Sequence, residues 1–165
     1  MSEIRGFDVG PSEWLLSESP FVVRRRVKWG ECDPAGVVYT VNFSEYVISI
    51  VNRFYSYLLG SPSETAKDRN GFGTPVKALS FVFNRSLRPD ECFDVSVAVG
   101  DVRERSFDLS MEATTKDGES VFSAKLSPIC IERRERRSIP IPPKFRERLL
   151  EVASCRAVAN THAGD

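Results

Sequence analysis

The chain has 165 residues, a hydrophobic fraction of 41% and a charged fraction of 28%, which fits one globular domain with a sizeable core. Lysine plus arginine equals aspartate plus glutamate at 23 each, so no overall charge attracts nucleic acid or an anionic membrane. No stretch approaches the roughly 20 apolar residues of a membrane helix, and the N-terminus lacks the apolar segment of a signal peptide. We therefore expect no nucleic-acid partner and no membrane partner, and any anion site must come from a local cluster.

The cysteines and the single histidine narrow the chemistry further. Cys32, Cys92, Cys130 and Cys155 lie far apart and form no CxxC pair, so we expect no metal site and no disulfide framework. Reduced thiols are typical of the cytoplasm, which is the location we expect. The only histidine, His162, lies three residues from the C-terminus, where a general base is rarely held in place.

The first elements in chain order are an irregular extension, a strand and a loop. Residues 1–20 are expected to be the extension, which ends at Pro20. Phe21–Trp29 is rich in β-branched and aromatic residues and predicts a strand. The following segment, Gly30–Thr40, contains two glycines and a proline and predicts a loop.

Asn42–Leu59 is the one long helical pattern. Its β-branched content makes a strand the competing interpretation, but apolar residues recur at spacings of three and four, which favours a helix. They are Phe43, Tyr46, Val47, Ile50, Val51, Phe54 and Leu58. Asn42 followed by Glu45 resembles a capping box, and Gly60 is a natural C-terminal stop.

A polar loop, Ser61–Gly73, precedes four successive strand patterns. Lys116-Asp117-Gly118 joins the last two of these patterns and is typical of a hairpin turn. We expect the four strands to form an antiparallel meander. They are Thr74–Asn84, Glu91–Val102, Ser106–Thr115 and Glu119–Ile131.

This order predicts an α+β protein with the hot-dog fold, a curved antiparallel sheet wrapped around a long central helix. A flat sheet could not bury a helix as apolar as Asn42–Leu59. A short amphipathic C-terminal helix begun by Pro142 or Pro143 should follow the sheet. We expect a single domain over residues 21–150 and a tail over residues 151–165.

The loop before the helix carries the candidate chemistry. Within ten residues it joins Asp33, a tight turn and a helix N-terminus, whose first N–H groups lack internal partners and carry partial positive charge. Such amides could polarise a thioester carbonyl, while Asp33 attacks its carbon or activates water. The alternative is that Asp-Pro-Ala-Gly is only a turn. Cys32 has no nearby histidine to activate it and is interpreted as a packing residue.

The segment WGECDPAGVVYTVNF resembles the motif of the 4-hydroxybenzoyl-CoA thioesterase family, W/F-G-D-x-D-P-A-G-x-V-x-Y-x-N. The resemblance continues at Gly73–Val76, Arg103–Phe107 and Ile139–Pro143. It covers roughly residues 21–150, and the loop carries most of its specificity.

The resemblance implies a homodimer that assembles further into a tetramer, with active sites at the subunit interface. It implies that Asp33 is the catalytic carboxylate, as nucleophile or general base, and that the backbone N–H of Thr40 is the oxyanion donor. CoA would be part of the substrate, and no separate cofactor is expected. The substrate contacts implied are Gly36, Val37, Tyr39, Ile48, Thr74, and, for the CoA phosphates, Arg103 and Arg105.

Two departures from the family pattern bear on the substrate. Glu31 replaces the usual first aspartate and keeps its charge. Ile48 stands where 4-hydroxybenzoyl-CoA enzymes carry an acid near the substrate phenol, and it cannot accept that hydrogen bond. We therefore expect an aromatic or medium-chain acyl-CoA other than 4-hydroxybenzoyl-CoA.

Several alternatives stay open. The chain could act on acyl carrier protein in a polyketide or fatty-acid pathway, or bind acyl thioesters without cleaving them. A dehydratase on this fold would use histidine, which His162 does not supply in the right place. Arg103 and Arg105 could be merely solvated. The arginines at 133, 134, 136 and 137 alternate with glutamates and predict a solvated edge, and Phe54, Tyr55 and Tyr57 are expected in the core or at an interface.

Overall fold

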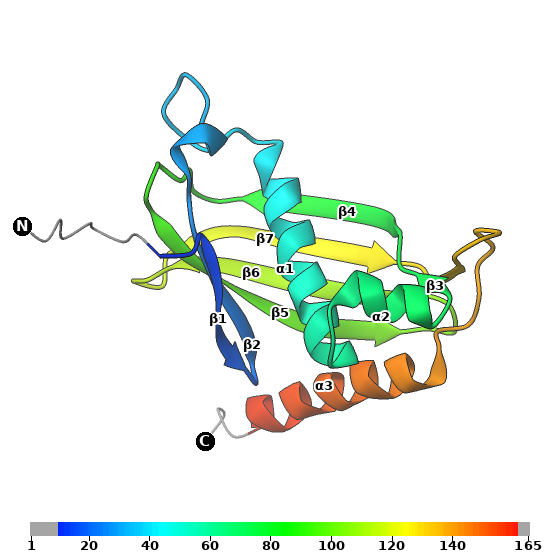
Figure 1. Cartoon of the computed structure of the whole chain (residues 1–165). Coiled ribbons are helices and arrows are strands. Elements are labelled where there is room, and N and C mark those ends of the chain that lie inside the picture. The colour runs from blue at the N-terminus through cyan, green and yellow to red at the C-terminus, as the bar shows by residue number, and fades with distance from the viewer. Residues whose placement is uncertain (1–9, 162–165) are drawn as a thin grey trace, which may run out of the picture.

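A computed structural model describes the backbone of residues 10–161 and the side chains of residues 10–155; His162 lies outside this range. Most of the strands form one antiparallel sheet of six, in the order β1-β2-β5-β6-β7-β4 (Figure 1). Its strands are β1 (Glu13–Glu18), β2 (Phe21–Arg26), β4 (Val76–Phe83), β5 (Cys92–Val102), β6 (Phe107–Thr115) and β7 (Ser120–Pro128). A second sheet pairs β3 (Phe72–Gly73) with β8 (Ile131–Glu132).

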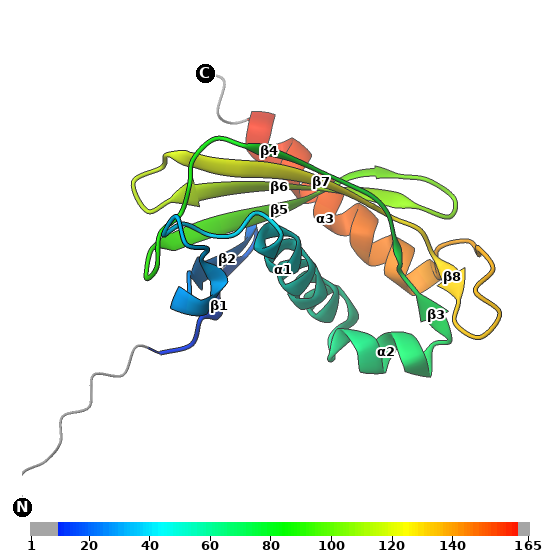
Figure 2. The same ribbon diagram turned by 90° about the horizontal axis from the view of Figure 1, so that it is seen from above.

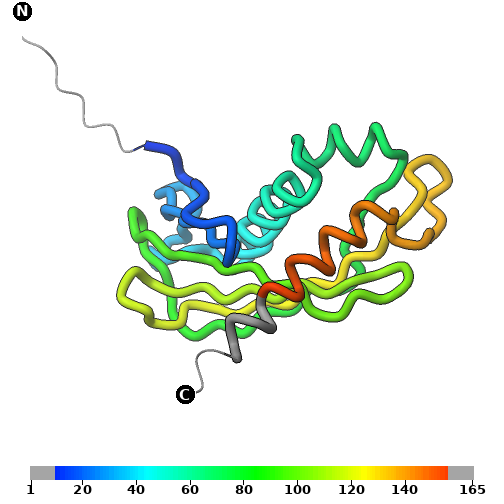
Figure 3. The backbone as a smooth tube through the Cα atoms, turned by 90° about the horizontal axis from the view of Figure 1, so that it is seen from below, coloured from blue at the N-terminus to red at the C-terminus, as the bar shows by residue number. Residues whose placement is uncertain are grey.

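Of the three helices in the described part of the chain, two lie on one face of the large sheet and the third runs along its β5 side, as Figures 2 and 3 show. They are α1 (Asn42–Leu59), α2 (Ser63–Arg69) and α3 (Pro143–Thr161), and a short 3-10 turn, η1 (Trp29–Glu31), precedes them. The sheet curves around α1, and α3 packs beside α1 and against β5. The predicted α+β hot-dog arrangement is therefore confirmed.

Helix α1 has the bounds that its apolar spacing predicts. All seven residues of the predicted stripe are buried. The helix ends at Gly60, whose φ of 66° is left-handed, as a glycine stop requires. The predicted capping box is wrong, because Val41 occupies the N-cap without a side-chain bond and the Asn42 side chain bonds to the loop instead.

Apolar residues alternate along β5 and β6, and in the structure they lie on the buried face of the sheet, as predicted. Phe93, Val95, Val97 and Val99 of β5 are buried, and so are three of their four partners across the ladder on β6, namely Ala113, Met111 and Leu109. The two predicted strands start within one residue of the observed ones. The buried faces of these two strands pack in the same hydrophobic core as α1.

The predicted meander of four is wrong. β5, β6 and β7 are consecutive neighbours, but β4 pairs with β7 and β5 pairs with β2. The connection from β4 to β5 is too long for a tight hairpin, and it is fixed by Leu87, which is fully buried. Alternation identifies a strand but not its neighbour.

Three further predictions need correction. Residues 1–20 are not wholly irregular, because Glu13–Glu18 forms the edge strand β1 and pairs with β2. Ser61–Gly73 is not simply a loop, because it contains α2 and β3. The C-terminal helix is not short: α3 has 19 residues and runs into the tail predicted for residues 151–165.

No helix in the described part of the chain is long and apolar enough to cross a membrane.

Candidate active site

Asp33 lies in a tight bend closed by an antiparallel bridge between Cys32 and Val38. Its N–H donates to the Val37 carbonyl at 2.9 Å, and its carbonyl accepts from the Gly36 N–H at 2.9 Å. Gly36 has a φ of 77°, the left-handed region that a glycine adopts without strain. One carboxylate oxygen, Oδ1, accepts from the Ala35 N–H at 2.8 Å, so Asp33 also helps to form its own bend.

The second carboxylate oxygen of Asp33 has a different status. Oδ2 accepts no hydrogen bond from any residue that the structure describes, and Asp33 is only half-buried. The turn-forming role and a chemical role are therefore compatible, because they use different oxygens.

The residues that open α1 provide free amides near this bend. The Thr40 carbonyl accepts from the Phe43 N–H at 3.3 Å, but no acceptor within residues 10–161 takes the N–H of Thr40 or of Val41. Thr40 is exposed. Unpaired amides at a helix start carry partial positive charge and suit an oxyanion.

Glu31 holds this loop in place through hydrogen bonds of both its backbone carbonyl and its side chain. Its carbonyl accepts from the Tyr39 N–H at 3.0 Å and from the Asn42 side-chain amide at 2.7 Å, which closes the loop on itself. Its carboxylate accepts from the Tyr46 hydroxyl at 2.7 Å and from Arg25 at 2.9 Å. The bend that holds Asp33 is thus attached both to α1 and to β2.

Arg25 is the cation at the centre of this attachment and is only 5% exposed. It lies between Glu31 and Glu13, which it contacts at 2.7 Å, and its guanidinium lies 4.2 Å from the centre of the Tyr46 ring. Burial alone would raise the pKa of Glu31, but the hydrogen bonds from Tyr46, the Lys28 backbone and Arg25 lower it. Glu31 therefore remains ionised at neutral pH. No pattern in the sequence indicates this position of Arg25.

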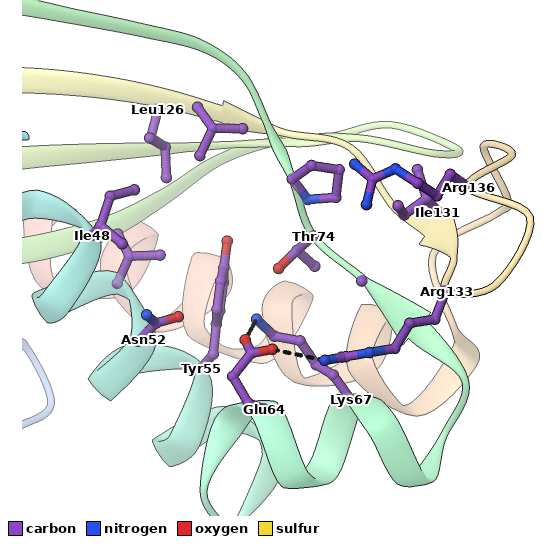
Figure 4. Close-up of a pocket in the computed structure, with 14 residues that line it drawn as sticks. Ile48, Asn52, Tyr55, Glu64, Lys67, Thr74, Leu126, Ile131, Arg133 and Arg136 are labelled. Atoms are coloured by element: carbon purple, nitrogen blue, oxygen red, sulfur yellow. Dashed lines mark hydrogen bonds and ion pairs between the residues drawn. The ribbon is translucent and has the colours of Figure 1, made fainter.

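A pocket of about 370 Å³ lies along the middle and C-terminal half of α1, between α1, α2 and the strands β4, β7 and β8 (Figure 4). Ile48, Asn52 and Tyr55 face it from α1, at spacings of four and three. Thr74 and Leu126 contribute from the sheet side. Around the rest of the wall lie Glu64, Lys67, Arg133 and Arg136.

The structure divides the predicted site residues into two groups. Ile48 and Thr74 come together in the pocket. Asp33 and the other loop residues do not line it, because the loop lies at the N-terminal end of α1 and α2 lies at its C-terminal end (Figure 1). Asp33, Gly36, Val37, Tyr39 and Thr40 form this second group. Within one chain, the candidate carboxylate and the pocket are apart.

The two arginines predicted to contact CoA are held by neighbouring protein groups. Arg103 binds Asp108 with both terminal nitrogens, at 2.7 and 3.1 Å, and Arg105 donates to the Ser138 carbonyl at 2.8 Å. The turn that carries them, between β5 and β6, lies at the end of the sheet away from the Asp33 loop (Figure 1). About half of each side chain stays exposed.

Sequence reasoning missed the polar end of the pocket. Tyr55 is buried as predicted, yet its hydroxyl faces the pocket, and the repeat of Ile48, Asn52 and Tyr55 on one helical face was the signal for it. Lys67 was missed because its helix was predicted as a loop. Arg133 was expected on a solvated edge, but it pairs with Glu64 at 3.2 Å and lines the pocket.

Neither a metal site nor a cysteine nucleophile is supported by the described residues. No cluster of three metal-ligating side chains occurs within them. Burial, with Glu31 and Asp33 nearby, raises the pKa of Cys32, so this thiol stays protonated and is a poor nucleophile.

Comparisons with known proteins identify the family of the chain and its fold. The family model for the thioesterase-like superfamily matches residues 27–149. The chain is 24% identical over 133 residues to the 4-hydroxybenzoyl-CoA thioesterase of Pseudomonas sp. (strain CBS-3), which covers 76% of this chain and 94% of that protein.

Solved structures share the same architecture. A 1,4-dihydroxy-2-naphthoyl-CoA thioesterase from Synechocystis has a TM-score of 0.72 at 19% identity, over 80% of this chain and 96% of that one. A hypothetical protein from Staphylococcus aureus, solved in complex with CoA, has a TM-score of 0.77 at 16% identity, over 89% of each chain. These similarities show the fold.

Proposed function

The chain belongs to the thioesterase-like superfamily, and from this premise we propose that it hydrolyses an acyl-CoA thioester with Asp33 as the catalytic carboxylate. The observation that carries the proposal is the presence, in one loop, of a carboxylate oxygen and of two amides at the start of α1 that have no hydrogen-bond partner among the described residues. The carboxylate supplies the attack, and the amides receive the charge that the attack creates.

The chemistry follows from these two groups. Asp33 either attacks the thioester carbon itself or removes a proton from a water that attacks it. In both cases the carbonyl oxygen becomes an oxyanion, which the Thr40 N–H stabilises, and the CoA thiolate leaves when the carbonyl re-forms. If Asp33 is the nucleophile, water then hydrolyses the acyl anhydride and frees the carboxylate.

A homodimer would supply the contact that a single chain lacks. Strand β4 is an unpaired edge, with Val76, Val82 and Phe83 exposed along it. Near the Asp33 loop, Trp29 is 83% exposed, and Tyr39 and Val41 are largely exposed. A second copy packed on these surfaces would bury them and bring one chain's loop towards the other chain's pocket. Assembly of two such dimers into a tetramer stays a prediction.

The proposed substrate is an aromatic or medium-chain acyl-CoA. Two of the relatives named above are thioesterases of aromatic acyl-CoA substrates, and the third was solved in complex with CoA. Ile48 lies in the pocket wall and offers no acceptor to a phenol, so 4-hydroxybenzoyl-CoA is not the substrate proposed. Arg103 and Arg105, each still half exposed, are proposed to contact the CoA phosphates.

The substitution Asp33→Asn tests the proposed carboxylate. An amide oxygen can still accept the Ala35 N–H, so the bend and the thermal unfolding midpoint should be kept. Loss of the carboxylate should lower kcat at least about a hundredfold in a thiol-release assay with a panel of acyl-CoAs. Asp117→Asn, in the exposed turn between β6 and β7, is the matched control and should keep full activity.

A second candidate function is binding of acyl thioesters without turnover. It is favoured by the hydrogen bond from the Ala35 N–H to Oδ1, since a purely turn-forming aspartate would make the same contact. The assay separates the two: wild-type protein that binds acyl-CoA in a calorimetric titration but releases no thiol would establish the second candidate. Equal turnover by wild type and Asp33→Asn would remove Asp33 from the mechanism.

A further inference from the structure

Two buried hydroxyls face the pocket without a hydrogen bond. The Tyr55 hydroxyl and the Thr74 hydroxyl lie beside each other, yet neither has a partner of acceptable geometry in the part of the chain that the structure describes. Tyr55 is only 2% exposed. A buried polar group left unpaired is destabilising, so both hydroxyls need a hydrogen-bond acceptor in the pocket.

The pKa of the Tyr55 phenol determines what it offers to a ligand. Burial raises this pKa strongly, and the Thr74 hydroxyl lowers it by less. The phenol therefore stays protonated and can donate a hydrogen bond. A group that accepts hydrogen bonds fits this end of the pocket.

A buried ammonium lies next to these hydroxyls. Lys67 is 3% exposed and its Nζ lies 4.5 Å from the centre of the Tyr55 ring. Among the residues that the structure describes, its one carboxylate partner is Glu64, at 2.9 Å, and Glu64 is shared with Arg133. An ammonium has three N–H donors, so Lys67 keeps donors for a ligand.

The charges around the pocket leave a positive excess. Lys67, Arg133 and Arg136 line it, together with the carboxylate of Glu64. Outside the pocket, Asp68 pairs with Arg133 at 3.4 Å. Three cations against two carboxylates leave one positive charge without a counterpart in this group.

The end of the pocket around Ile48 and Leu126 is mostly apolar, with the Asn52 amide beside Ile48 (Figure 4). The apolar side chains of the lining include Ile48, Val51, Val76 and Leu126. Ile48 and Tyr55 are seven residues apart on α1, which is roughly 10 Å along the helix axis. The pocket therefore offers an apolar stretch that leads to a group of hydrogen-bond donors and positive charge, as Figure 4 shows.

We propose that this pocket binds the acyl part of the substrate and selects acyl groups that end in a carboxylate, held by Tyr55, Thr74 and Lys67. The apolar wall holds the methylene or ring portion, and the carboxylate accepts from the two hydroxyls and the ammonium. The inference rests on the proposed thioesterase function, and it assigns the class of acyl group, which that function leaves open.

The test compares hexanoyl-CoA with adipoyl-CoA, which have equal carbon number and differ in the terminal carboxylate. Wild-type protein should prefer adipoyl-CoA by roughly tenfold in kcat/KM, since hydrogen bonds to a charged group are worth about 1.5–3 kcal/mol. Lys67→Met keeps the length of the side chain and should remove most of that preference. Tyr55→Phe removes one oxygen without changing the fold and should reduce the preference by a smaller factor.

The control variants are Lys116→Met, in the turn between β6 and β7, and Tyr57→Phe, on α1 outside the pocket. Both should keep the wild-type preference. Free CoA serves as an inhibitor in the same assays and should inhibit the wild type and Lys67→Met equally. Weaker CoA inhibition of Lys67→Met would show that these cations bind a CoA phosphate, which would overturn the proposal.

The outcomes separate this inference from the proposed function. Equal hydrolysis of the two thioesters, with an equal effect of Lys67→Met on both, would leave the proposed function intact. It would also show that water satisfies the two hydroxyls and that the inference is wrong. If neither ester is hydrolysed, both are stable ligands for calorimetric titration. Tighter binding of adipoyl-CoA that Lys67→Met abolishes would then support the pocket assignment without the enzyme, and equal binding would refute it.

Discussion

Glu31 is the residue that converts the sequence motif into a fixed loop. It contacts Arg25 on β2 and Tyr46 on α1, and its carbonyl closes the loop through Tyr39 and Asn42. The motif identified Glu31 as a conservative replacement of aspartate. The carboxylate of this longer side chain contacts both β2 and α1, so it links the two elements.

Glu31→Gln should destabilise the protein. The amide keeps the shape of the side chain but removes the negative charge beside the buried Arg25, so we expect a loss of roughly 2 kcal/mol in the free energy of unfolding. Urea denaturation measures it. Glu45→Gln changes an exposed carboxylate with no ion pair among the described residues and should stay within about 0.5 kcal/mol of wild type. Equal midpoints for both variants would mean that Glu13 alone is sufficient for Arg25.

At the residue scale, the sequence predicts functional groups that lie close together along the chain better than groups that only the fold brings together. Asp33 and the Thr40 N–H belong to one continuous loop, so the motif alone indicates them. Tyr55, Lys67 and Thr74 meet only because α1, α2 and the start of β4 converge, and no local pattern encodes that meeting. The candidate site is thus predictable as a motif and not as a cavity.

At the element scale, predictability follows the amount of buried apolar surface. α1 and the strands β5 and β6 bury regular apolar stripes, and the sequence places them to within a residue. β1 is an exposed edge strand and α2 buries only a few side chains, so neither has a periodic signal. The position of β4 beside β7 depends on a long connection and on no pattern within the strand.

One ion pair joins three of these elements and makes a prediction about pH. Asp108 on β6 is bound by Arg103 at the turn after β5 and by Ser127 on β7. The Arg103 hydrogen bond is the main cause that lowers the pKa of Asp108 from 3.8 to about 2. Because the folded-state pKa lies below the unfolded one, the stabilisation is complete above pH 4 and is lost as the pH falls towards 2. It amounts to about 2 kcal/mol.

Asp108→Asn removes this titration. The difference in unfolding free energy between wild type and variant should be largest at neutral pH and should shrink as the pH falls from about 4 to about 2. Asp101→Asn is the control at the same corner, since its carboxylate is exposed and 4.0 Å from Arg103. A difference for Asp108→Asn that does not vary with pH would assign its effect to packing and not to charge.

At the scale of the whole molecule, the separation of the Asp33 loop from the pocket is the central feature. The loop and the polar end of the pocket lie at opposite ends of α1 (Figure 1). A two-fold arrangement that pairs one β4 edge with another would reverse the direction of the second chain. That reversal would set each loop near the other chain's pocket, so activity should depend on the dimer.

The double variant Ala78→Lys, Val82→Lys tests that dependence. Both residues are exposed on the β4 edge, and lysines on an edge oppose strand pairing because the two-fold axis doubles each charge. Wild type should sediment as a dimer or as the predicted tetramer of two dimers, and the variant should sediment as a smaller species with little acyl-CoA hydrolysis. Leu15→Lys, Leu16→Lys places the same charges on β1, the other edge of the sheet, and should stay dimeric and active. A monomeric β4 variant with full activity would place the whole catalytic site within one chain, because no partner would then be needed to supply either half.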